Sequence, residues 1–347
     1  MKIKFFIICL LISMAFGIGA QADVLKVAVI HSYEKGTWTN EGTEGVIKAL
    51  TQSGQKFEIK EEIYDYTKFK NTNDKNQKMK TVIDNLKLNK TALVILFDDE
   101  AADDLVPSLN QIKIPIVLTG INKDQSEIKW FMKEGDPKRF FTGILERYPF
   151  EQSLKMLKTI KPSVKKISIL TSENETSRIV TGQIKDKFKY YKGAFSGIKL
   201  ENTYFTSSWE KWKKVILNNN QDDRAFWILV PWNVNDDSGK EVDLRGMGDF
   251  YRENSKIPEI GIVNINDKLG FIASFSVGAE DLGFQAGQMA LQIFKNKLIP
   301  RDTPFVSNSL VRFVINKKRA DRLKITIPSA FLDFAKIEKK IPMDYFR

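Results

Sequence analysis

The sequence predicts an α/β fold made of two doubly wound lobes, each built on a parallel sheet. The main observation is a set of six short apolar runs, each of which stops in a polar or aromatic cluster: Val27–Ile30, Ala92–Phe97, Ile114–Leu118, Ile167–Leu170, Ala225–Val230 and Ile257–Val263. Continuous runs of Val, Ile and Leu of this length are typical of strands buried on both faces of a parallel sheet. Amphipathic stretches alternate with the runs, which is the βαβ pattern.

The stretches between the runs predict helices from the spacing of their apolar residues. One helix lies near Asn40–Ser53 and a second within Glu146–Lys161. Ser207 and Glu210 predict a capping box for a third helix. Asn202–Phe205 predicts a further strand. A fourth helix has one apolar face, formed by Leu282, Ala286, Met289 and Ile293.

The number of strand–helix repeats bears on the number of lobes. About three repeats precede residue 123, and three more lie between residues 142 and 265. A single sheet of six strands would accommodate them, but the polar stretch Lys123–Phe141 contains Gly135-Asp136-Pro137 and interrupts the pattern. This interruption favours two similar lobes.

The first residues have the pattern of a secretory signal. Lys2 and Lys4 precede the apolar stretch Phe5–Phe16, and Ala20-Gln21-Ala22 is a small-x-small cleavage site. The apolar stretch is shorter than the ~20 residues that span a bilayer. We therefore expect residues 1–22 to be a signal peptide cleaved after Ala22, and the mature protein to be soluble in the periplasm.

Composition excludes several classes of function. The only cysteine, Cys9, lies in the signal segment, so disulfides, thiol catalysis and cysteine-ligated zinc are excluded from the mature chain. A single histidine, His31, argues against a histidine-rich metal site, and no cofactor or metal is expected. The net charge is +11, or +9 once Lys2 and Lys4 are removed. The basic residues are scattered among acidic ones, which is typical of a solvated surface and not of nucleic-acid binding.

In α/β folds of this kind, ligands bind outside the carboxyl ends of the strands. Asp98, Asp99 and Glu100 directly follow a buried run, and burying three carboxylates without partners is costly, so at least one is expected to face a ligand. A ligand ammonium would supply a charge-assisted partner. The alternative is the first turn of a helix, where acidic residues are favourable. Glu146, near another strand end, is predicted either to contact ligand or to lie at the surface.

The remaining candidate ligand-binding residues also follow strand ends. Trp38 and Trp232 lie in opposite halves and would enclose a flat or apolar ligand between them, or else belong to the core. His31, Ser32 and Tyr33 end the first run, where backbone N–H groups and a helix start can hold a carboxylate or phosphate. Neutral donors and acceptors complete the predicted site; these are Thr119, Asn122, Ser172, Asn174 and Asn233. A hydrogen-bonded loop residue is the alternative for His31, and a turn or cap is the alternative for Ser172 and Asn174.

Several segments, in their order along the chain, resemble one family. They are Val29–Tyr33 with Trp38, Leu96–Ala102, Pro115–Asn122, Thr142–Glu146, and Val277–Gly287 with Ile299-Pro300. This set is similar to periplasmic ligand-binding proteins of the ABC-transporter substrate-binding type, with the type I periplasmic fold. The resemblance implies two lobes joined by three crossings, with ligand held between them. Lobe one would comprise 23–141 plus about 270–300, and lobe two 142–269 plus about 301–347.

The predicted function follows from this resemblance and the candidate site. We expect an exported, monomeric solute-binding protein that captures a small amine-bearing or aromatic ligand and presents it to a membrane ABC permease. A ligand-sensing subunit for a membrane sensor kinase or cyclase is an alternative within the same fold. A carboxylate-based hydrolase, using Asp98 and Glu146 as acid and base, ranks lower. The chain has no nucleophile elbow, phosphate loop or metal signature, so we do not expect an enzyme.

Overall fold

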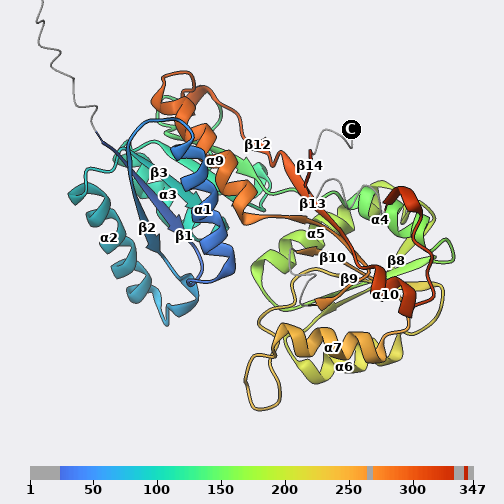
Figure 1. Cartoon of the computed structure of the whole chain (residues 1–347). Helices are drawn as coiled ribbons and strands as arrows, with labels where there is room; N and C mark the ends of the chain where they lie inside the picture. Colours follow the sequence, from blue (N-terminus) through green and yellow to red (C-terminus); the bar gives the residue numbers. More distant parts are fainter. Residues whose placement is uncertain (1–23, 264–268, 332–339, 343–347) are drawn as a thin grey trace, which may run out of the picture.

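The computed structural model describes residues 24–263, 269–331 and 340–342. These residues form two α/β lobes, each with its own sheet, and the predicted two-lobed fold is confirmed (Figure 1). The predicted signal segment lies outside the described residues. Among the residues described, no helix is long and apolar enough to pass through a membrane.

The first lobe is built on a six-stranded parallel sheet in the order β12-β5-β4-β3-β1-β2. Its strands are β1 (Leu25–His31), β2 (Phe57–Ile63), β3 (Leu93–Phe97), β4 (Ile116–Ile121), β5 (Phe141–Leu145) and β12 (Val306–Ser307). Helices α1 (Thr37–Thr51) and α9 (Ala279–Phe294) cover one face, and α2 (Thr72–Leu88) and α3 (Asp99–Gln111) cover the other. The apolar runs of β1, β3 and β4 are buried on both faces, as predicted.

The second lobe is built on an eight-stranded sheet in the order β14-β13-β11-β10-β9-β6-β8-β7. Its strands are β6 (Lys166–Thr171), β7 (Ala194–Phe195), β8 (Ile198–Phe205), β9 (Arg224–Ile228), β10 (Glu259–Val263), β11 (Ala273–Val277), β13 (Leu310–Ile315) and β14 (Lys340–Pro342). Helices α4 (Phe150–Ile160) and α5 (Glu175–Tyr190) cover one face, α6 (Trp209–Asn218) and α7 (Leu244–Asn254) the other, and α10 (Lys317–Arg322) follows β13. The predicted capping box of Ser207 and Glu210 is wrong: Ser208 is the N-cap of α6 and accepts from Lys211 N, while Ser207 accepts from Glu173 N.

The chain passes between the two sheets three times. The passages follow β5, β11 and β12. Each passage lies somewhat further along the chain than the predicted boundary between the lobes. Strand β5 still pairs with β4 in the first sheet, and β11 pairs with β10 in the second. Strand β12 returns to the first sheet, where it pairs with β5. Two passages are tied together, since Arg147 N donates to Asn308 Oδ1 at 2.7 Å.

Helices α1 and α9 approach each other backbone to backbone. A Cβ at Gly283 would lie 2.1 Å from the carbonyl oxygen of Gly42, and a Cβ at Gly45 would lie 2.0 Å from that of Glu280. Only glycine fits at such a separation. The contact fixes the start of α9, and with it the crossing that leads from β11 into the first lobe.

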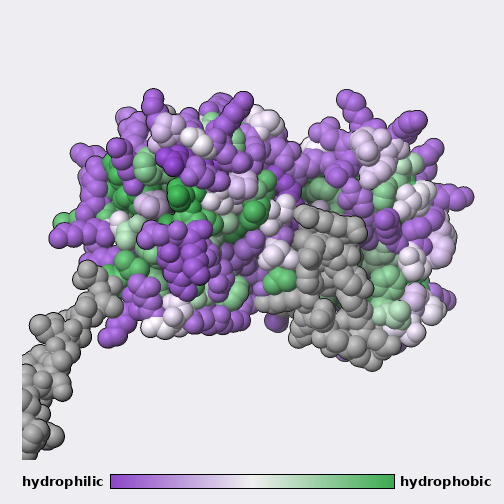
Figure 2. All heavy atoms as spheres, turned by 90° about the horizontal axis from the view of Figure 1, so that it is seen from above, coloured by the Kyte–Doolittle hydropathy of each residue, from purple (hydrophilic) through white to green (hydrophobic). Residues whose placement is uncertain are grey.

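The polar stretch Lys123–Phe141 packs on the first lobe. Trp130 Nε1 donates to Asp103 Oδ1 at 2.9 Å, and the Trp130 ring meets Phe141 edge to face. The guanidinium of Arg139 is buried against Phe141 and donates to the carbonyl oxygens of Phe141 and Thr303. The aromatic residues of this stretch therefore pack against the hydrophobic core of the first lobe. Where the face in Figure 2 is coloured, hydrophilic side chains surround smaller hydrophobic areas.

Candidate functional site

The carboxyl ends of β1, β3, β4 and β5 lie side by side in the first sheet, because the strands are parallel neighbours. Asp98 N donates to Thr119 O at 2.9 Å, and Glu146 N donates to Ile121 O at 2.8 Å. These two bonds bring the ends of β3 and β5 to the end of β4. Residues separated by almost fifty positions in sequence thus meet at one edge of the sheet.

Four acidic side chains gather at this edge; we call Asp98, Asp99, Glu100 and Glu146 the carboxylate cluster. Asp98, Asp99 and Glu146 are at most 5% exposed. Burial raises the pKa of Asp99 to about 6 and that of Glu100 and Glu146 to about 7. The pKa of Asp98 rises well above its usual range, through burial first and then through the charges of Glu100 and Glu146. The structure thus places these four carboxylates together at one edge of the first sheet.

Each member of the carboxylate cluster has a hydrogen-bond partner on at least one oxygen. Trp38 Nε1 donates to Asp98 Oδ1 at 3.1 Å, and the Tyr33 hydroxyl donates to Glu100 Oε1 at 3.2 Å. The Tyr148 hydroxyl donates to Glu146 Oε1 at 2.5 Å. Asp99 is different, since the backbone N–H groups of residues 122 and 123 donate to its two oxygens. Asp99 therefore holds the loop after β4, and the other three carboxylates have neutral side-chain donors.

Three buried acceptor atoms at this edge have no hydrogen-bond partner. They are Asp98 Oδ2, Glu100 Oε2 and Asn122 Oδ1. A buried acceptor without a donor is unfavourable by about 1–3 kcal/mol. The Asn122 amide is oriented by its Nδ2, which donates to Gly120 O and to Glu146 Oε2, each at 3.4 Å. All three atoms would be satisfied by a ligand rich in hydrogen-bond donors.

Gly120 lies between two of the carboxylates. Its φ of +72° is in the left-handed region, and a Cβ placed there would lie 3.0 Å from Asp98 Oδ1 and 3.8 Å from Glu146 Oε2. Asp98 also has a positive φ, of 70°. Strained backbone of this kind persists where the surroundings fix it, often at binding sites. Because Gly120 has no side chain, the point beside its Cα is within 4 Å of an oxygen of each carboxylate.

Three of the predicted site residues in this lobe contact the scaffold. His31 Nε2 donates to the Thr43 hydroxyl at 2.8 Å, since that hydroxyl donates to Glu61, and burial lowers the pKa of His31 to about 4. Ser32 Oγ donates to Phe97 O at 2.8 Å and accepts from Ala101 N. Thr119 Oγ1 donates to Leu282 O of α9. These side chains hold α1, α3 and α9 in place around the carboxylate cluster.

The start of α5 in the second lobe faces this edge. The hydroxyls of Tyr33 and Thr176 lie 3.5 Å apart, and Lys123 Nζ lies 3.7 Å from Glu175 Oε1. Gln183 Nε2 donates to Asn122 O at 2.8 Å. The predicted residues Ser172 and Asn174 immediately precede this helix. Asn174 accepts from Ser177 N as a cap and donates to the buried Ser172 hydroxyl, so both have the cap and turn roles given as their alternative.

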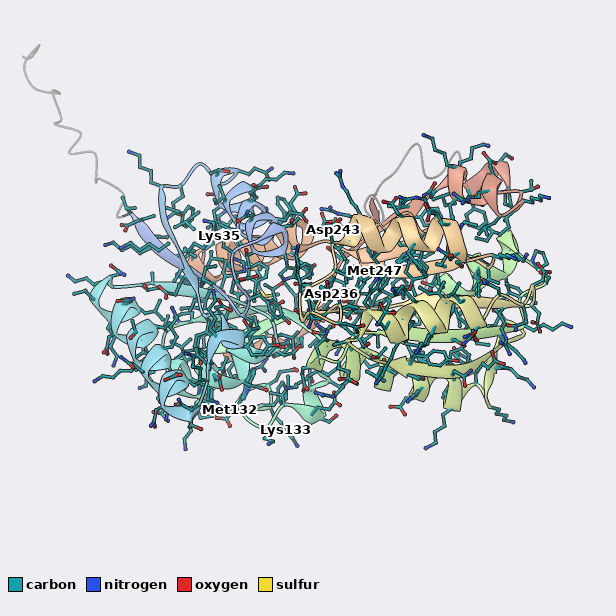
Figure 3. All side chains as sticks on the ribbon, turned by 90° about the horizontal axis from the view of Figure 1, so that it is seen from below. Lys35, Met132, Lys133, Asp236, Asp243 and Met247 are labelled. Carbon is teal, nitrogen blue, oxygen red and sulfur yellow. The ribbon has the colours of Figure 1, made fainter. Side chains whose placement is uncertain are left out.

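The loop after β9 carries the remaining predicted residues. Trp232 is 36% exposed, and Asn233 takes a positive φ of 59° while its N–H donates to Glu241. Asp236 accepts from Ser238 and Lys240 and so closes a turn. Figure 3 shows Asp236 and Asp243 at the side of the second lobe that faces the first, with Lys35 on the first lobe. The structure does not bring Trp232 or Asn233 into contact with the carboxylate cluster.

The sequence comparison decides the family. The model of the ABC transporter substrate binding protein family matches residues 26–339. The chain belongs to this family. No curated protein gives a significant sequence match.

Several solved structures have the same fold as this member of the ABC transporter substrate binding protein family. An ABC domain from Streptococcus pneumoniae in complex with L-Trp is 22% identical, with a TM-score of 0.64 over 88% of this chain and 98% of that one. A conserved domain protein from Vibrio cholerae is 22% identical, with a TM-score of 0.66 over 89% and 98%. The ligand-free, open substrate binding protein CD0873 of Clostridium difficile is 19% identical, with a TM-score of 0.64 over 88% and 97%. The predicted type I periplasmic binding fold is confirmed.

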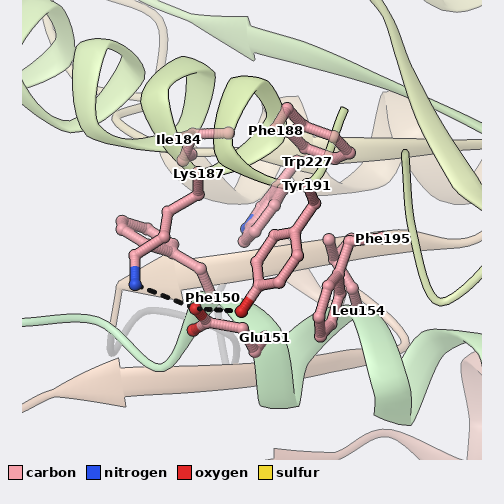
Figure 4. Close-up of a pocket in the computed structure, with 9 residues that line it drawn as sticks. All are labelled: Phe150, Glu151, Leu154, Ile184, Lys187, Phe188, Tyr191, Phe195 and Trp227. Atoms are coloured by element: carbon pink, nitrogen blue, oxygen red, sulfur yellow. Dashed lines mark hydrogen bonds and ion pairs between the residues drawn. The ribbon is translucent and has the colours of Figure 1, made fainter. Parts of the chain in front are cut away.

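Besides a hollow next to α10, which Lys317, Asp321 and Lys324 line, two further hollows lie in the described part of this substrate binding protein. One lies between α4, α5 and the second sheet, where Phe150, Phe188, Phe195 and Trp227 line it beside the Glu151–Lys187 pair (Figure 4). Its volume of about 10 Å³ is no more than one water needs, so it is a packing gap. The other is a groove of about 1000 Å³ between the lobes, lined by Arg147, Tyr148, Gln183 and the crossing Val306–Leu310.

Three residues of the site were absent from the predicted set. Tyr148 is the donor to Glu146, and Thr176 and Gln183 contact the first lobe from α5. Tyr148 lies two residues after Glu146, and Thr176 lies two residues after Asn174. In both cases the signal in the sequence was a position two residues after a predicted site residue. Gln183 lies within a helix, and nothing in the sequence distinguishes it from a surface residue. No group of three or more metal-binding side chains occurs among the described residues.

Proposed function

We propose that this protein is an exported solute-binding protein that captures a small amine-bearing ligand between its lobes and presents it to an ABC importer. The observation that carries the proposal is the carboxylate cluster with its unpartnered acceptors Asp98 Oδ2, Glu100 Oε2 and Asn122 Oδ1. An ammonium donates three hydrogen bonds and carries the opposite charge. It is therefore the functional group that satisfies this set of atoms best.

Aromatic side chains around the carboxylate cluster support a ring in the ligand. Trp38 and Tyr33 each donate to a cluster carboxylate, and the ring of Tyr66 lies 5.7 Å from that of Tyr33. Flat side chains of this kind stack on a flat or apolar ligand. The structurally similar Streptococcus pneumoniae domain was solved with L-Trp, a molecule with an ammonium and a ring. A ligand of this class fits the chemistry of the first lobe.

Closure of the lobes around the ligand would produce the form that the importer recognises. Three crossings join the lobes, and the contacts between Tyr33 and Thr176 and between Asn122 and Gln183 lie at the same edge as the carboxylate cluster. A ligand touching both lobes binds the closed form more tightly and so shifts the population towards it. The signal pattern of residues 1–22 supports export, with the mature protein beginning at Asp23.

The test is a thermal-shift screen of residues 23–347, with Trp fluorescence followed on the same samples. Amino acids, aromatic amines, polyamines, sugars, nucleosides and short peptides would each be tested, every amine beside its N-acetyl derivative. A ligand at 100 times its Kd stabilises the folded form by about 2.7 kcal/mol. We expect shifts with free amines and none with their N-acetyl forms. Shifts with polyanions alone would contradict the proposal, and product formed from a hit would favour the hydrolase.

A further inference from the structure

We infer that the ligand ammonium exchanges with a proton: the unliganded carboxylate cluster holds one proton beside Gly120, and the ammonium replaces it. This inference rests on the proposed function, since it specifies where the amine binds. In the unliganded protein, one carboxyl of the Asp98–Glu146 pair is neutral. On binding, that carboxyl loses its proton to solvent and the ammonium pairs with the resulting carboxylate. One ammonium enters and one proton leaves, so the charge of the site is conserved.

The geometry at Gly120 supplies the place for this exchange. A Cβ at Gly120 would approach both Asp98 Oδ1 and Glu146 Oε2, so an atom near that point lies between the two carboxylates. Asp98 Oδ2 is buried without a partner. The Asn122 amide, which bonds to Glu146 through Nδ2, leaves its buried Oδ1 unpartnered in the same region. Asn122 carries no charge, so it marks a site for a donor independently of the acidic residues.

Among the described residues, no cation forms an ion pair with Asp98 or Glu146; the charge of Arg147 favours the ionised form of Glu146, but burial has the larger effect on the pKa of this carboxyl. Lys123 Nζ lies 2.6 Å from Asp103 Oδ2, and it also lies near Glu175 of α5. Arg147 donates to the carbonyl oxygens of residues 121, 122, 123 and 146 and to Asp124. Arg312 of β13 pairs with Asp281 and Glu280 at the start of α9. Each of these three cations therefore has hydrogen-bond or ion-pair partners outside the Asp98–Glu146 pair.

The other titratable groups facing the pair are acidic or neutral. Asp99 and Glu100 come from α3, and Tyr33 and Tyr66 come from the segments after β1 and β2; Glu175 of α5 lies near Tyr66 and Lys123. His31 lies under α1 and is neutral at pH 7, and Tyr148 donates to Glu146. Like charges at such short range in a buried site cannot all be ionised without a counter-ion. The raised pKa values of Asp98 and Glu146 agree with a proton retained there near neutral pH.

The first part of the test needs no ligand. Difference potentiometric titration compares the unliganded protein with Glu146→Gln and Asp98→Asn, and with Glu58→Gln as an exposed control on β2. We expect the wild type to release about one proton more than the two cluster variants between pH 6 and 8, and the control to match the wild type. Identical titration curves for wild type and both cluster variants would overturn the inference.

The second part measures the exchange itself. Calorimetric titration with tryptamine and L-tryptophan, in phosphate and in Tris at pH 7, gives the number of protons released from the dependence of the heat on the buffer. We expect a release approaching one proton per amine bound by the wild type, and less than half of that in Glu146→Gln. Binding without proton release would overturn the inference and leave the proposed function standing. If no primary amine of the screen binds, the proposed ligand class fails, and the inference fails with it.

Discussion

The hydroxyl of Tyr33 in the first lobe lies 3.5 Å from the hydroxyl of Thr176 in the second. The Tyr33 hydrogen is directed to Glu100 Oε1, so Thr176 is the donor in this contact. The start of α5 is therefore joined, through Tyr33, to a carboxylate of the proposed binding site. A ligand that engages Glu100 would alter the same chain of hydrogen bonds that links the lobes.

Removing the Thr176 hydroxyl is expected to weaken the closed form. In Thr176→Val, one hydrogen bond of about 0.5–1.5 kcal/mol is lost, which corresponds to a roughly two- to tenfold weaker affinity for an amine hit. Thr181→Val is the matched control, because Thr181 lies on the same helix and its buried hydroxyl has no partner. Calorimetric titration measures both. Equal affinity in the two variants would show that the contact does not contribute to closure.

Filling the space beside Gly120 is expected to block the amine. Gly120→Ala places a methyl group 3.0 Å from Asp98 Oδ1 and between the two carboxylates, so affinity should fall at least tenfold. Gly54→Ala is the control, since Gly54 has nearly the same φ, +73°, and nothing within 4 Å of its Cβ position. Both changes carry a backbone strain of about 1–2 kcal/mol. A Gly120→Ala protein that binds amines as tightly as Gly54→Ala would contradict this use of the space.

The carboxylate cluster should make the unliganded protein less stable as pH rises. The pKa of Glu146 is about 7 in the folded protein against 4.5 as its ordinary value, so the folded state keeps a proton that the unfolded state has lost. Its stabilising contribution is complete below pH 4.5 and disappears as pH rises through 7. Glu146→Gln should therefore gain up to about 3 kcal/mol relative to wild type over this range.

Urea unfolding of both proteins from pH 4.5 to 8 measures this difference. The lowered pKa of His31, about 4, gives the opposite slope at acid pH, but both proteins share it and it cancels. A constant difference between the two proteins across the range would show that Glu146 titrates normally.

The close approach of α1 and α9 should depend on glycine. Gly283→Ala brings a methyl group to 2.1 Å from the Gly42 carbonyl oxygen, and overpacking of this kind costs about 1–3 kcal/mol. Gly182→Ala is a control within α5, where nothing lies within 4 Å, and it should stabilise the protein by about 0.5–1 kcal/mol. Chemical denaturation distinguishes the two signs. Similar stability changes in the two variants would refute the backbone contact.

Apart from Asn202–Phe205, which lies in the partly buried β8, the strands that the sequence predicted are those buried on both faces, such as Ala92–Phe97 and Ala225–Val230, because burial demands a continuous apolar run. Strand β2 escaped prediction because Phe57–Ile63 alternates apolar residues with charged ones and is only partly buried at the sheet edge. The sequence placed the lobe boundary just before Thr142–Glu146, yet most of this stretch is β5 of the first lobe. Its pairing with β4 is a contact between distant parts of the chain, and the local sequence pattern does not indicate it.

The sequence predicted where the candidate site lies better than it predicted which side chains contact one another there. Asp98 and Glu146 meet because β3, β4 and β5 are neighbours, and strand order follows from the whole fold. His31, Ser32 and Thr119 also follow or end strands, but their side chains point towards α1, α3 and α9. A strand end has residues directed to both faces of the sheet, so position along the chain does not say which of them reach a ligand.

The most direct test of the account is a crystal structure of residues 23–347 with the tightest primary amine from the screen. The account predicts the ligand between the two lobes, with its nitrogen within hydrogen-bonding distance of Asp98 or Glu146 beside Gly120. It also predicts contacts from the start of α5. A ligand seated in the groove beside the crossing Val306–Leu310, or bound to one lobe away from the carboxylate cluster, would contradict it.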